Sequence, residues 1–224
     1  FVNFTGEYRY RGETNRATHQ QITIIEVPLH APEEAVARPY PIHNDTLTTP
    51  LVPDAVQGCH DVQVFMKLNI AAASCNGEGQ LWDISDPGNP CTVDPACHTH
   101  IRNPALVFWH TAAFTWDGKY VVFNDEWGGG GAHGCDGAQD TRGNGWMYRV
   151  VEPGQPIGPV EGRFMIPRAQ PASEVCTIHN SNFIPVNPNQ GYFLVSARYQ
   201  GGTNVTDWSD PAAPMELGFY EPTF

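Results

Sequence analysis

A phrase of eight residues that occurs twice constrains the fold of this chain more than any other feature. Residues 83–90 read DISDPGNP and residues 207–214 read DWSDPAAP, so both have the form Asp-x-Ser-Asp-Pro-x-x-Pro. In such a phrase Asp and Ser bond to their own backbone and proline fixes φ, which makes it a turn signal. A turn that recurs with this spelling indicates a repeat architecture.

The second copy of the phrase lies inside a segment that predicts four consecutive strands. Residues 179–220 begin with a histidine and alternate apolar or aromatic runs with the turns Asn-Pro-Asn-Gln-Gly and Gly-Gly. The phrase itself separates the third predicted strand, TNVTDWS, from the fourth, MELGFY. The segment therefore predicts an antiparallel meander of four strands.

Two earlier segments follow the same plan. Residues 60–90 begin with a histidine and end in the first copy of the phrase. Residues 110–164 also begin with a histidine, carry a Gly-rich insertion at 127–145, and end in a degraded phrase. Four-stranded repeats of about 40–45 residues are the signature of a β-propeller. We therefore predict an all-β chain that forms a β-propeller of four-stranded blades, whole or partial.

The extent of the repeats divides the chain. Residues 58–224 are predicted to form the blades, and residues 1–57 an N-terminal segment in which 22–40 resemble the remnant of a further blade. About three recognisable blades would leave two open edges, and unpaired edge strands pair readily with another chain. We therefore expect another protein chain, or self-association, at the open blade edges, unless the natural polypeptide is longer.

Several of these motifs together resemble the LVIVD-repeat proteins. The repeated phrase, the histidine-led strands, HTAAFTWDGKYVVFNDE (110–126) and YQGGTNVTDWSDPAAPMELGFY (199–220) carry the resemblance, which covers about residues 58–222. The resemblance implies a secreted or surface-anchored β-propeller of bacterial or archaeal origin. The family has no established common activity, so the resemblance informs the fold and the location more than the function.

Composition excludes two classes of partner. The net charge is −12, and the 12 Lys and Arg residues are scattered rather than clustered. Nucleic-acid binding needs clustered basic residues, so we expect no nucleic acid as a partner. No stretch approaches the ~20 apolar residues of a membrane span, so none is predicted.

The cysteines point to an oxidising compartment, and the sequons count only if the chain is secreted. The six cysteines form no CxxC pair, and we expect disulfides in a secreted or extracellular chain rather than buried or metal-binding thiols. Cys91 and Cys97 flank a short turn-rich loop and are predicted to bond. The natural remaining pairs are then Cys59–Cys75 and Cys135–Cys176, although six cysteines allow 15 pairings. The predicted glycosylation sites are Asn3, Asn44 and Asn204.

Three histidines open the three predicted blades. His60, His110 and His179 each precede a run of matching pattern, so they occupy equivalent positions on successive blades. The first strand of a blade lines the central channel, and the three rings are therefore expected to converge there. Neutral imidazoles in such a group can hold Zn²⁺, Cu²⁺ or Fe²⁺, with Glu126 as a carboxylate ligand or a base. The alternative is structural: a repeated histidine that bonds a backbone group of the next blade.

Two weaker metal sites are also conceivable from the sequence. Carboxylates in and beside the Gly-rich insertion can bind Ca²⁺, although no EF-hand pattern is present; they are Asp125, Glu126, Asp136 and Asp140. A peripheral site can be drawn from His98, His100 and His133. In both cases the alternative is a structural loop.

The leading functional hypothesis is a secreted or cell-surface β-propeller that acts as a binding or assembly module. It depends on the repeats, on the expected disulfides, and on the lack of a nucleotide fingerprint or a nucleophile elbow in the sequence. The alternative hypothesis is a metal-dependent oxidoreductase or hydrolase with the histidine site on the propeller axis. Fold alone does not decide between them.

Overall fold

The computed structural model describes most of the chain. The described residues are 21–43, 58–75, 77–131, 142–186 and 190–222. Within these ranges the regular structure consists of β-strands and of short 3-10 turns at Pro32–Glu34 and Tyr199–Gly201. No helix in these ranges is long and apolar enough to cross a membrane.

The strands form three four-stranded sheets and one hairpin, and every pairing is antiparallel. Blade 1 contains β3 (Cys59–Phe65), β4 (Ile70–Cys75), β5 (Glu78–Asp83) and β6 (His98–Ile101). Blade 2 contains β7 (Trp109–Phe114), β8 (Tyr120–Asp125), β9 (Gly145–Arg149) and β10 (Gly162–Phe164). Blade 3 contains β11 (Ser181–Phe183), β12 (Phe193–Ala197), β13 (Thr203–Asp207) and β14 (Met215–Tyr220). The hairpin pairs β1 (Gln21–Glu26) with β2 (Val36–Pro41).

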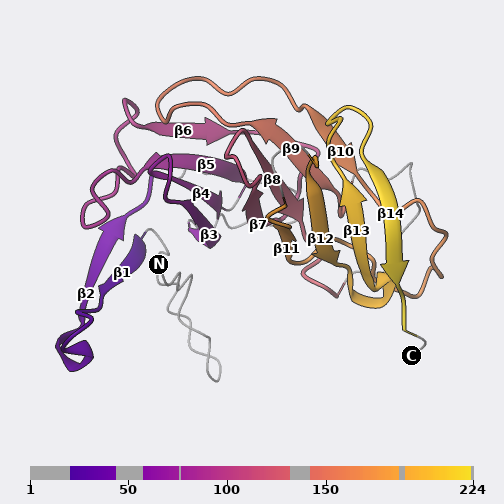
Figure 1. Cartoon of the computed structure of the whole chain (residues 1–224), viewed down its shortest axis with the longest axis horizontal. Helices are drawn as coiled ribbons and strands as arrows, with labels where there is room; N and C mark the ends of the chain where they lie inside the picture. Colours follow the sequence, from indigo (N-terminus) through magenta and orange to yellow (C-terminus); the bar gives the residue numbers. More distant parts are fainter. Residues whose placement is uncertain (1–20, 44–57, 76, 132–141, 187–189, 223–224) are drawn as a thin grey trace.

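The three sheets follow one another along an arc. Within each sheet the strands pair in chain order, and Figure 1 shows β3, β7 and β11 side by side on the inside of the arc, with β6, β10 and β14 toward its outside. This is the arrangement of consecutive β-propeller blades. The predicted fold class is confirmed.

The repeated phrase acts as a pair of side-chain-capped turns in both blades. In blade 1, Asp83 accepts a hydrogen bond from the Ser85 amide at 2.7 Å, and Asp86 accepts one from the Gly88 amide at 3.0 Å. In blade 3 the corresponding bonds, from Ser209 to Asp207 and from Ala212 to Asp210, measure 2.8 and 3.1 Å. The two copies therefore fold alike because the same aspartates hold the same backbone amides.

One detail differs from the sequence interpretation. In blade 3 the phrase leads directly into the fourth strand, as predicted. In blade 1 the phrase is followed by a loop that the Cys91–Cys97 disulfide closes, and the fourth strand, β6, begins only at His98. The predicted Cys91–Cys97 bond is confirmed, and Cys59 and Cys75 also form a disulfide, which joins β3 to β4.

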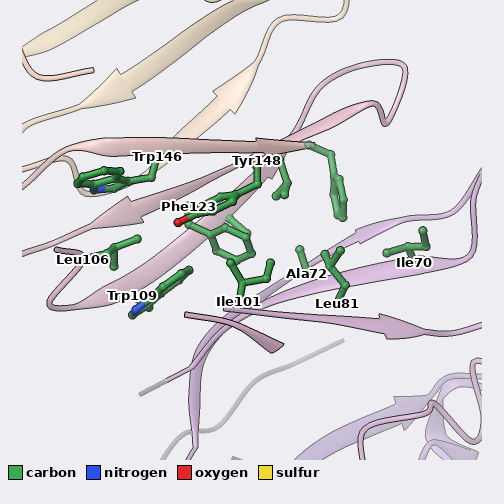
Figure 2. Packing of buried hydrophobic residues seen from close by; sticks show 12 residues of the cluster. Ile70, Ala72, Leu81, Ile101, Leu106, Trp109, Phe123, Trp146 and Tyr148 are labelled. Atoms are coloured by element: carbon green, nitrogen blue, oxygen red, sulfur yellow. The ribbon is translucent and has the colours of Figure 1, made fainter. Parts of the chain in front are cut away.

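Apolar side chains fill the space between blade 1 and blade 2. Leu81 and Ile101 of blade 1 pack in one cluster with Trp109, Phe123 and Tyr148 of blade 2 (Figure 2). The Trp109 and Phe123 rings meet edge to face, with their centroids 5.1 Å apart. This interface fixes the position of β7 against blade 1, and therefore the position of the histidine that β7 carries.

The remaining clusters hold the outer parts of the arc. Ala113, Val122 and Met147 of blade 2 pack with Leu194 and Trp208 on one face of blade 3. On the other side of blade 1, the hairpin β1–β2 supplies Ile22, Ile24 and Tyr40 to a cluster that contains Trp82 and Ile84. The hairpin thus covers blade 1 from outside, as the remnant of a blade would. The boundary predicted at residue 57 lies outside the described residues.

Candidate metal-binding site

The three predicted histidines lie at the same end of the three innermost strands. His60 is in β3, His110 is in β7, and His179 precedes β11 by two residues. The pairing of β3 with β4 shifts register around His60, and the pairing of β7 with β8 shifts around His110. Such bulges commonly re-aim a side chain out of the regular pleat.

The three rings form a ladder from blade to blade. The His60 Nδ1 lies 3.1 Å from the carbonyl oxygen of His110, and the His110 Nδ1 lies 3.1 Å from the carbonyl oxygen of His179. The ring centroids are 4.0 Å apart for the first pair and 4.5 Å apart for the second. The three rings therefore lie close together, as expected. The Nδ1 atoms of His60 and His110 contact backbone carbonyls of the next blade, as the structural alternative predicts. We call this arrangement the histidine ladder.

The ladder determines the tautomer of His110. A carbonyl oxygen is an acceptor, so the His110 Nδ1 must carry the hydrogen that it donates to His179. Burial, together with the neighbouring His60 and His179, lowers the His110 pKa to about 3, so the ring is neutral at physiological pH. A neutral ring with hydrogen on Nδ1 presents an unprotonated Nε2, which is the form that binds a metal ion.

Glu126 faces the Nε2 atoms of two of these histidines. It directly follows β8, and its amide donates to the carbonyl oxygen of Phe108 at 3.0 Å. Its Oε2 lies 3.2 Å from the His110 Nε2, and its Oε1 lies 3.5 Å from the His179 Nε2. One ligand atom from each of the three residues lies within 4.8 Å of the others. This is a donor set of two imidazole nitrogens and one carboxylate oxygen.

The contact between His110 and Glu126 needs a cation between its two atoms. The His110 Nε2 is an acceptor, and an ionised Glu126 would place a second acceptor 3.2 Å away. Desolvation raises the Glu126 pKa to about 7, so near neutral pH a proton is readily held between them. A metal ion can replace that proton and satisfy both atoms.

Tyr199 belongs to the same group, and sequence reasoning missed it. Its hydroxyl donates to the Glu126 Oε1, and its ring centroid is 5.2 Å from that of His179. Tyr199 has a φ of 49°, which is strained for a bulky residue. Gly130 lies against the hydroxyl, where a Cβ atom would overlap it. The available signal was the Tyr-Gln-Gly-Gly turn, which reads as an ordinary loop.

His60 differs from the other two histidines. It belongs to the histidine ladder, but it is not a member of the group formed by His110, Glu126 and His179. Its side chain is exposed, and its ring stacks on His110 from the side away from His179. The structure gives His60 a contact that orients His110, and its place as a metal ligand stays a prediction.

A polar cavity of about 310 Å³ runs along the inner strands beside the histidines. The residues that follow each ladder histidine line it: Asp61, Val62, Gln63, Thr111, Ala112, Asn180, Ser181 and Asn182. The side-chain amide of Asn124 donates hydrogen bonds to Thr111, to Ser181 and to the carbonyl oxygen of His179, and so links blades 2 and 3 beside the cavity. The inside of the arc thus offers hydrogen-bonding groups from all three blades.

The weaker metal predictions find less support. Asp125 is fully buried, and its two carboxylate oxygens accept hydrogen bonds from the Phe108 and Gly143 amides, so it pins the insertion rather than facing a cation. His98 and His100 lie in strand β6 and not in a loop, and neither belongs to a metal-ligand group among the described residues. The other predicted members lie outside the described residues: His133, Asp136 and Asp140.

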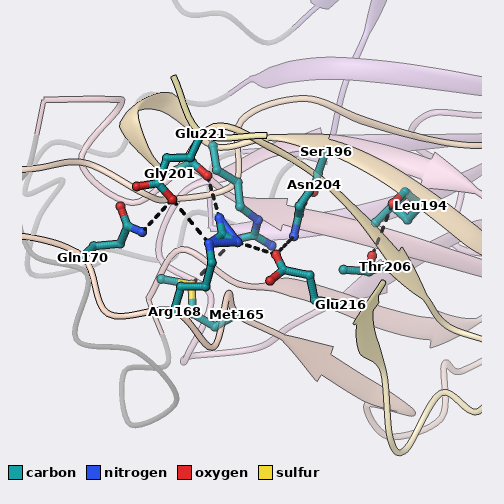
Figure 3. Close-up of polar contacts among 11 residues, drawn as sticks. Met165, Arg168, Gln170, Leu194, Ser196, Gly201, Asn204, Thr206, Glu216 and Glu221 are labelled. Atoms are coloured by element: carbon teal, nitrogen blue, oxygen red, sulfur yellow. Dashed lines mark hydrogen bonds and ion pairs between the residues drawn. The ribbon is translucent and has the colours of Figure 1, made fainter. Parts of the chain in front are cut away.

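Most of the remaining cysteine and sequon predictions lie outside the described residues, and one lies inside them. Cys135, Asn3 and Asn44 lie outside the described residues, so the Cys135–Cys176 pair and two sequons stay predictions. Asn204 is 1% exposed, and its amide nitrogen donates to Glu216 at 3.0 Å (Figure 3). A glycan on that buried nitrogen would displace this bond, so glycosylation at Asn204 does not fit the structure.

Comparison with solved structures gives the fold and little else. The chain is similar to the Dos1 propeller with a TM-score of 0.53 and 10% identity, over 82% of this chain and 42% of that one. It is also similar to a "putative 6-phosphogluconolactonase" from Bacteroides fragilis with a TM-score of 0.55 and 11% identity, over 92% of this chain and 52% of that one. The chain thus spans about half the length of these solved structures. Identities this low establish a β-propeller fold alone.

The sequence comparisons return no relative. No family model matches the chain, and no curated protein matches it. The resemblance to the LVIVD-repeat proteins therefore stays a prediction, while the broader assignment to the β-propellers stands on the structure.

Proposed function

We propose that this chain is part of a secreted β-propeller module that binds a divalent transition-metal ion through His110, His179 and Glu126. The two disulfides favour an oxidising compartment. Two imidazoles and one carboxylate form a donor set that suits Zn²⁺, Cu²⁺ or Fe²⁺ better than Ca²⁺, which prefers oxygen ligands. The binding module predicted from the sequence is thus proposed to bind a transition-metal ion.

The observation that carries the proposal is the pairing of two acceptors in a buried place. The His110 Nε2 and the Glu126 Oε2 face each other at 3.2 Å, and both side chains are nearly inaccessible to solvent. When Glu126 is ionised, these two buried acceptors have no donor between them, which is costly. A divalent cation bound between them removes this cost, and the His179 side chain, which is 36% exposed, leaves one side open for a water ligand.

Calorimetric titration of the metal-free protein with Zn²⁺ tests this proposal. We expect one ion per chain. His179→Ala and Glu126→Gln each remove a ligand and should weaken binding by about 100-fold or more, since even outer contacts of a metal site account for 10–100-fold. Affinity should rise between pH 6 and pH 8, because the ion competes with the proton on Glu126, whose pKa is about 7.

His60→Ala is the matched control. It removes a ladder histidine that contacts the ligand His110 but lies outside the ligand group, so Zn²⁺ affinity should fall by about tenfold or less, well short of the loss in His179→Ala. Equal losses for the His60 and His179 variants, or no stoichiometric binding to the wild-type protein, would contradict the proposal.

A second candidate function, metal-dependent hydrolysis, is favoured by the polar cavity along the inner strands. A metal-bound water can act as a nucleophile at neutral pH, and Asp61, Asn180 and Asn182 line the space that a small polar substrate would occupy. Screening the Zn²⁺-loaded protein against ester, lactone and phosphoester substrates tests it. Turnover must disappear in Glu126→Gln at saturating Zn²⁺, and turnover that survives this change would rule the candidate out.

A further inference from the structure

One face of blade 3 carries a row of apolar side chains that no described residue of the chain covers. Side chains that oppose each other across neighbouring strands point to the same face, and Val195 opposes Val205 while Phe193 and Met215 both oppose Asp207. All of these residues are half-buried or exposed, whereas the alternate positions, such as Leu194, are buried against blade 2. We call this surface the free face of blade 3.

The opposite end of the arc is apolar and exposed as well. In the hairpin, Ile22 and Ile24 pack on blade 1, so Ile25 and its cross-strand partner Ala37 point away from it. Exposed large apolar residues of the described chain gather at the two ends of the arc: Ile25, Val27 and Leu29 near the hairpin, and Met215, Leu217 and Tyr220 on β14. Apolar surface concentrated in this way marks interaction sites.

The contacts between successive blades indicate which kind of element would pack on the free face. His60 and His110 each donate to a carbonyl oxygen of the following blade, at 3.1 Å in both cases. No blade follows blade 3 within the described residues, so the ladder stops at His179. A sheet that docked on the free face would continue the apolar packing between blades, as the hairpin β1–β2 already does on the outer side of blade 1.

We propose that the free face of blade 3 docks on the hairpin β1–β2 of a second copy of this chain, and that two such contacts close a two-chain ring. The two ends differ from each other, so the contact is head-to-tail, and a head-to-tail contact that closes gives a finite ring. The solved propellers that the chain matches are about twice as long, since it covers 42% and 52% of them. This inference does not rest on the proposed metal site.

Sedimentation equilibrium of the purified chain in the presence of a chelator tests the association without any contribution from metal. We expect a mass of twice the 24.7 kDa of one chain at micromolar concentration. Met215→Glu places a charge on the free face and should weaken the dimer by about 30-fold or more, as a central interface position does. Met66→Glu is the matched control, because Met66 is similarly exposed (64% against 58%) but lies in the β3–β4 turn, and it should change the dissociation constant by less than about twofold.

Complementation of two variants tests the head-to-tail geometry. Met215→Glu blocks the free face, and Ala37→Glu blocks the outer face of the hairpin, so each variant alone should be monomeric. Mixed together, they retain one intact contact, from the unaltered hairpin of one variant to the unaltered free face of the other. The mixture should therefore dimerise with an affinity between those of the wild-type protein and the single variants.

Each other result overturns the proposal. If the wild-type chain stays monomeric up to about 1 mM, the free face of blade 3 does not bind a second copy of the chain. A dimer that resists Met215→Glu, or that Met66→Glu weakens equally, associates elsewhere. Ala37→Glu dimers that are as tight as the wild-type protein indicate a symmetric contact between two free faces, and open-ended polymers indicate a contact that does not close.

Discussion

Blades 2 and 3 are built from similar sequences but differ in what covers them. In blade 2, β8 reads YVVFND, and its residues after Tyr120 are all buried. In blade 3, β12 reads FLVSA, and buried residues alternate with half-buried ones. Both strands are apolar on both faces, yet only β8 has a neighbour on each side within the described chain. The residues of β12 are therefore suited to a neighbour that the described chain does not contain.

The two boundaries of blade 2 differ as well. Toward blade 1 the contact consists of aromatic and aliphatic side chains such as Trp109 and Phe123. Toward blade 3 the apolar contact is supplemented by a polar network in which Arg168 bonds Glu216 at 2.6 Å and Glu221 at 3.3 Å (Figure 3). The boundary between blades 2 and 3 is thus more polar than the boundary between blades 1 and 2, and the cost of a substitution should depend on the boundary in which it lies.

The largest expected effect separates the cores of the two blades. Phe123→Ala removes a fully buried ring between blades 1 and 2 and should cost about 4 kcal/mol of unfolding free energy. Phe193→Ala removes the same ring from the half-covered free face of blade 3 and should cost about 1 kcal/mol or less. Urea denaturation of both variants at low protein concentration measures the difference. Equal costs would mean that the free face is covered in solution even at that concentration.

The second prediction concerns the polar boundary between blades 2 and 3. Arg168→Met leaves the largely buried Glu216 carboxylate without its closest cation and should cost about 3 kcal/mol. Arg149→Met breaks the exposed pair with Glu161 and should cost less than about 1 kcal/mol. The same denaturation experiment compares the two. A cost for Arg168→Met no larger than that for Arg149→Met would show that the boundary depends on apolar packing alone.

The third and smallest effect isolates Glu126 through pH. Its pKa is raised to about 7, so the folded chain holds this proton more tightly than the unfolded chain does. The resulting stabilisation is present below about pH 4.5 and is lost as the pH rises through 7. In metal-free protein at pH 8, Glu126→Gln should therefore be more stable than the wild-type protein by about 2 kcal/mol.

The control for this prediction is the same comparison at pH 5. Glu126 is then protonated in the folded protein and only partly ionised in the unfolded chain, so the difference between the variant and the wild-type protein should shrink to about 1 kcal/mol or less. The lowered pKa of His110 affects stability only below about pH 6.5, so the comparison at pH 8 is free of it, and at pH 5 it acts on both proteins. A difference independent of pH would assign the effect to packing and not to the buried carboxylate.

The sequence predicts the fold well because the repeat carries its own turn chemistry. Asp83 and Asp207 hold equivalent backbone amides, so the phrase alone marks where blades 1 and 3 reverse direction. The equivalence of the repeats also places His60, His110 and His179 at one end of the inner strands. A rotation that relates blades brings equivalent residues together, and this needs no knowledge of side-chain packing.

The composition of the site is harder to predict. Glu126 contacts two of the three histidines because of the position that the pairing of β8 with β7 gives to its side chain. No sequence motif encodes that position. Tyr199 reaches Glu126 because its backbone adopts a positive φ, which no propensity assigns to tyrosine. The burial of Asn204 likewise follows from the contact between blades 2 and 3, and a sequon carries no information about it.

Long-range ¹⁵N NMR of the histidine side chains reads both the tautomer of His110 and the identity of the metal ligands. In metal-free protein the account predicts that His110 carries hydrogen on Nδ1 and stays neutral down to pH 5, in keeping with a pKa of about 3. Addition of one equivalent of Zn²⁺ should then shift the Nε2 resonances of His110 and His179, while the nitrogens of His60 move little. Hydrogen on the His110 Nε2, or equal Zn²⁺-induced shifts at all three histidines, would contradict the account.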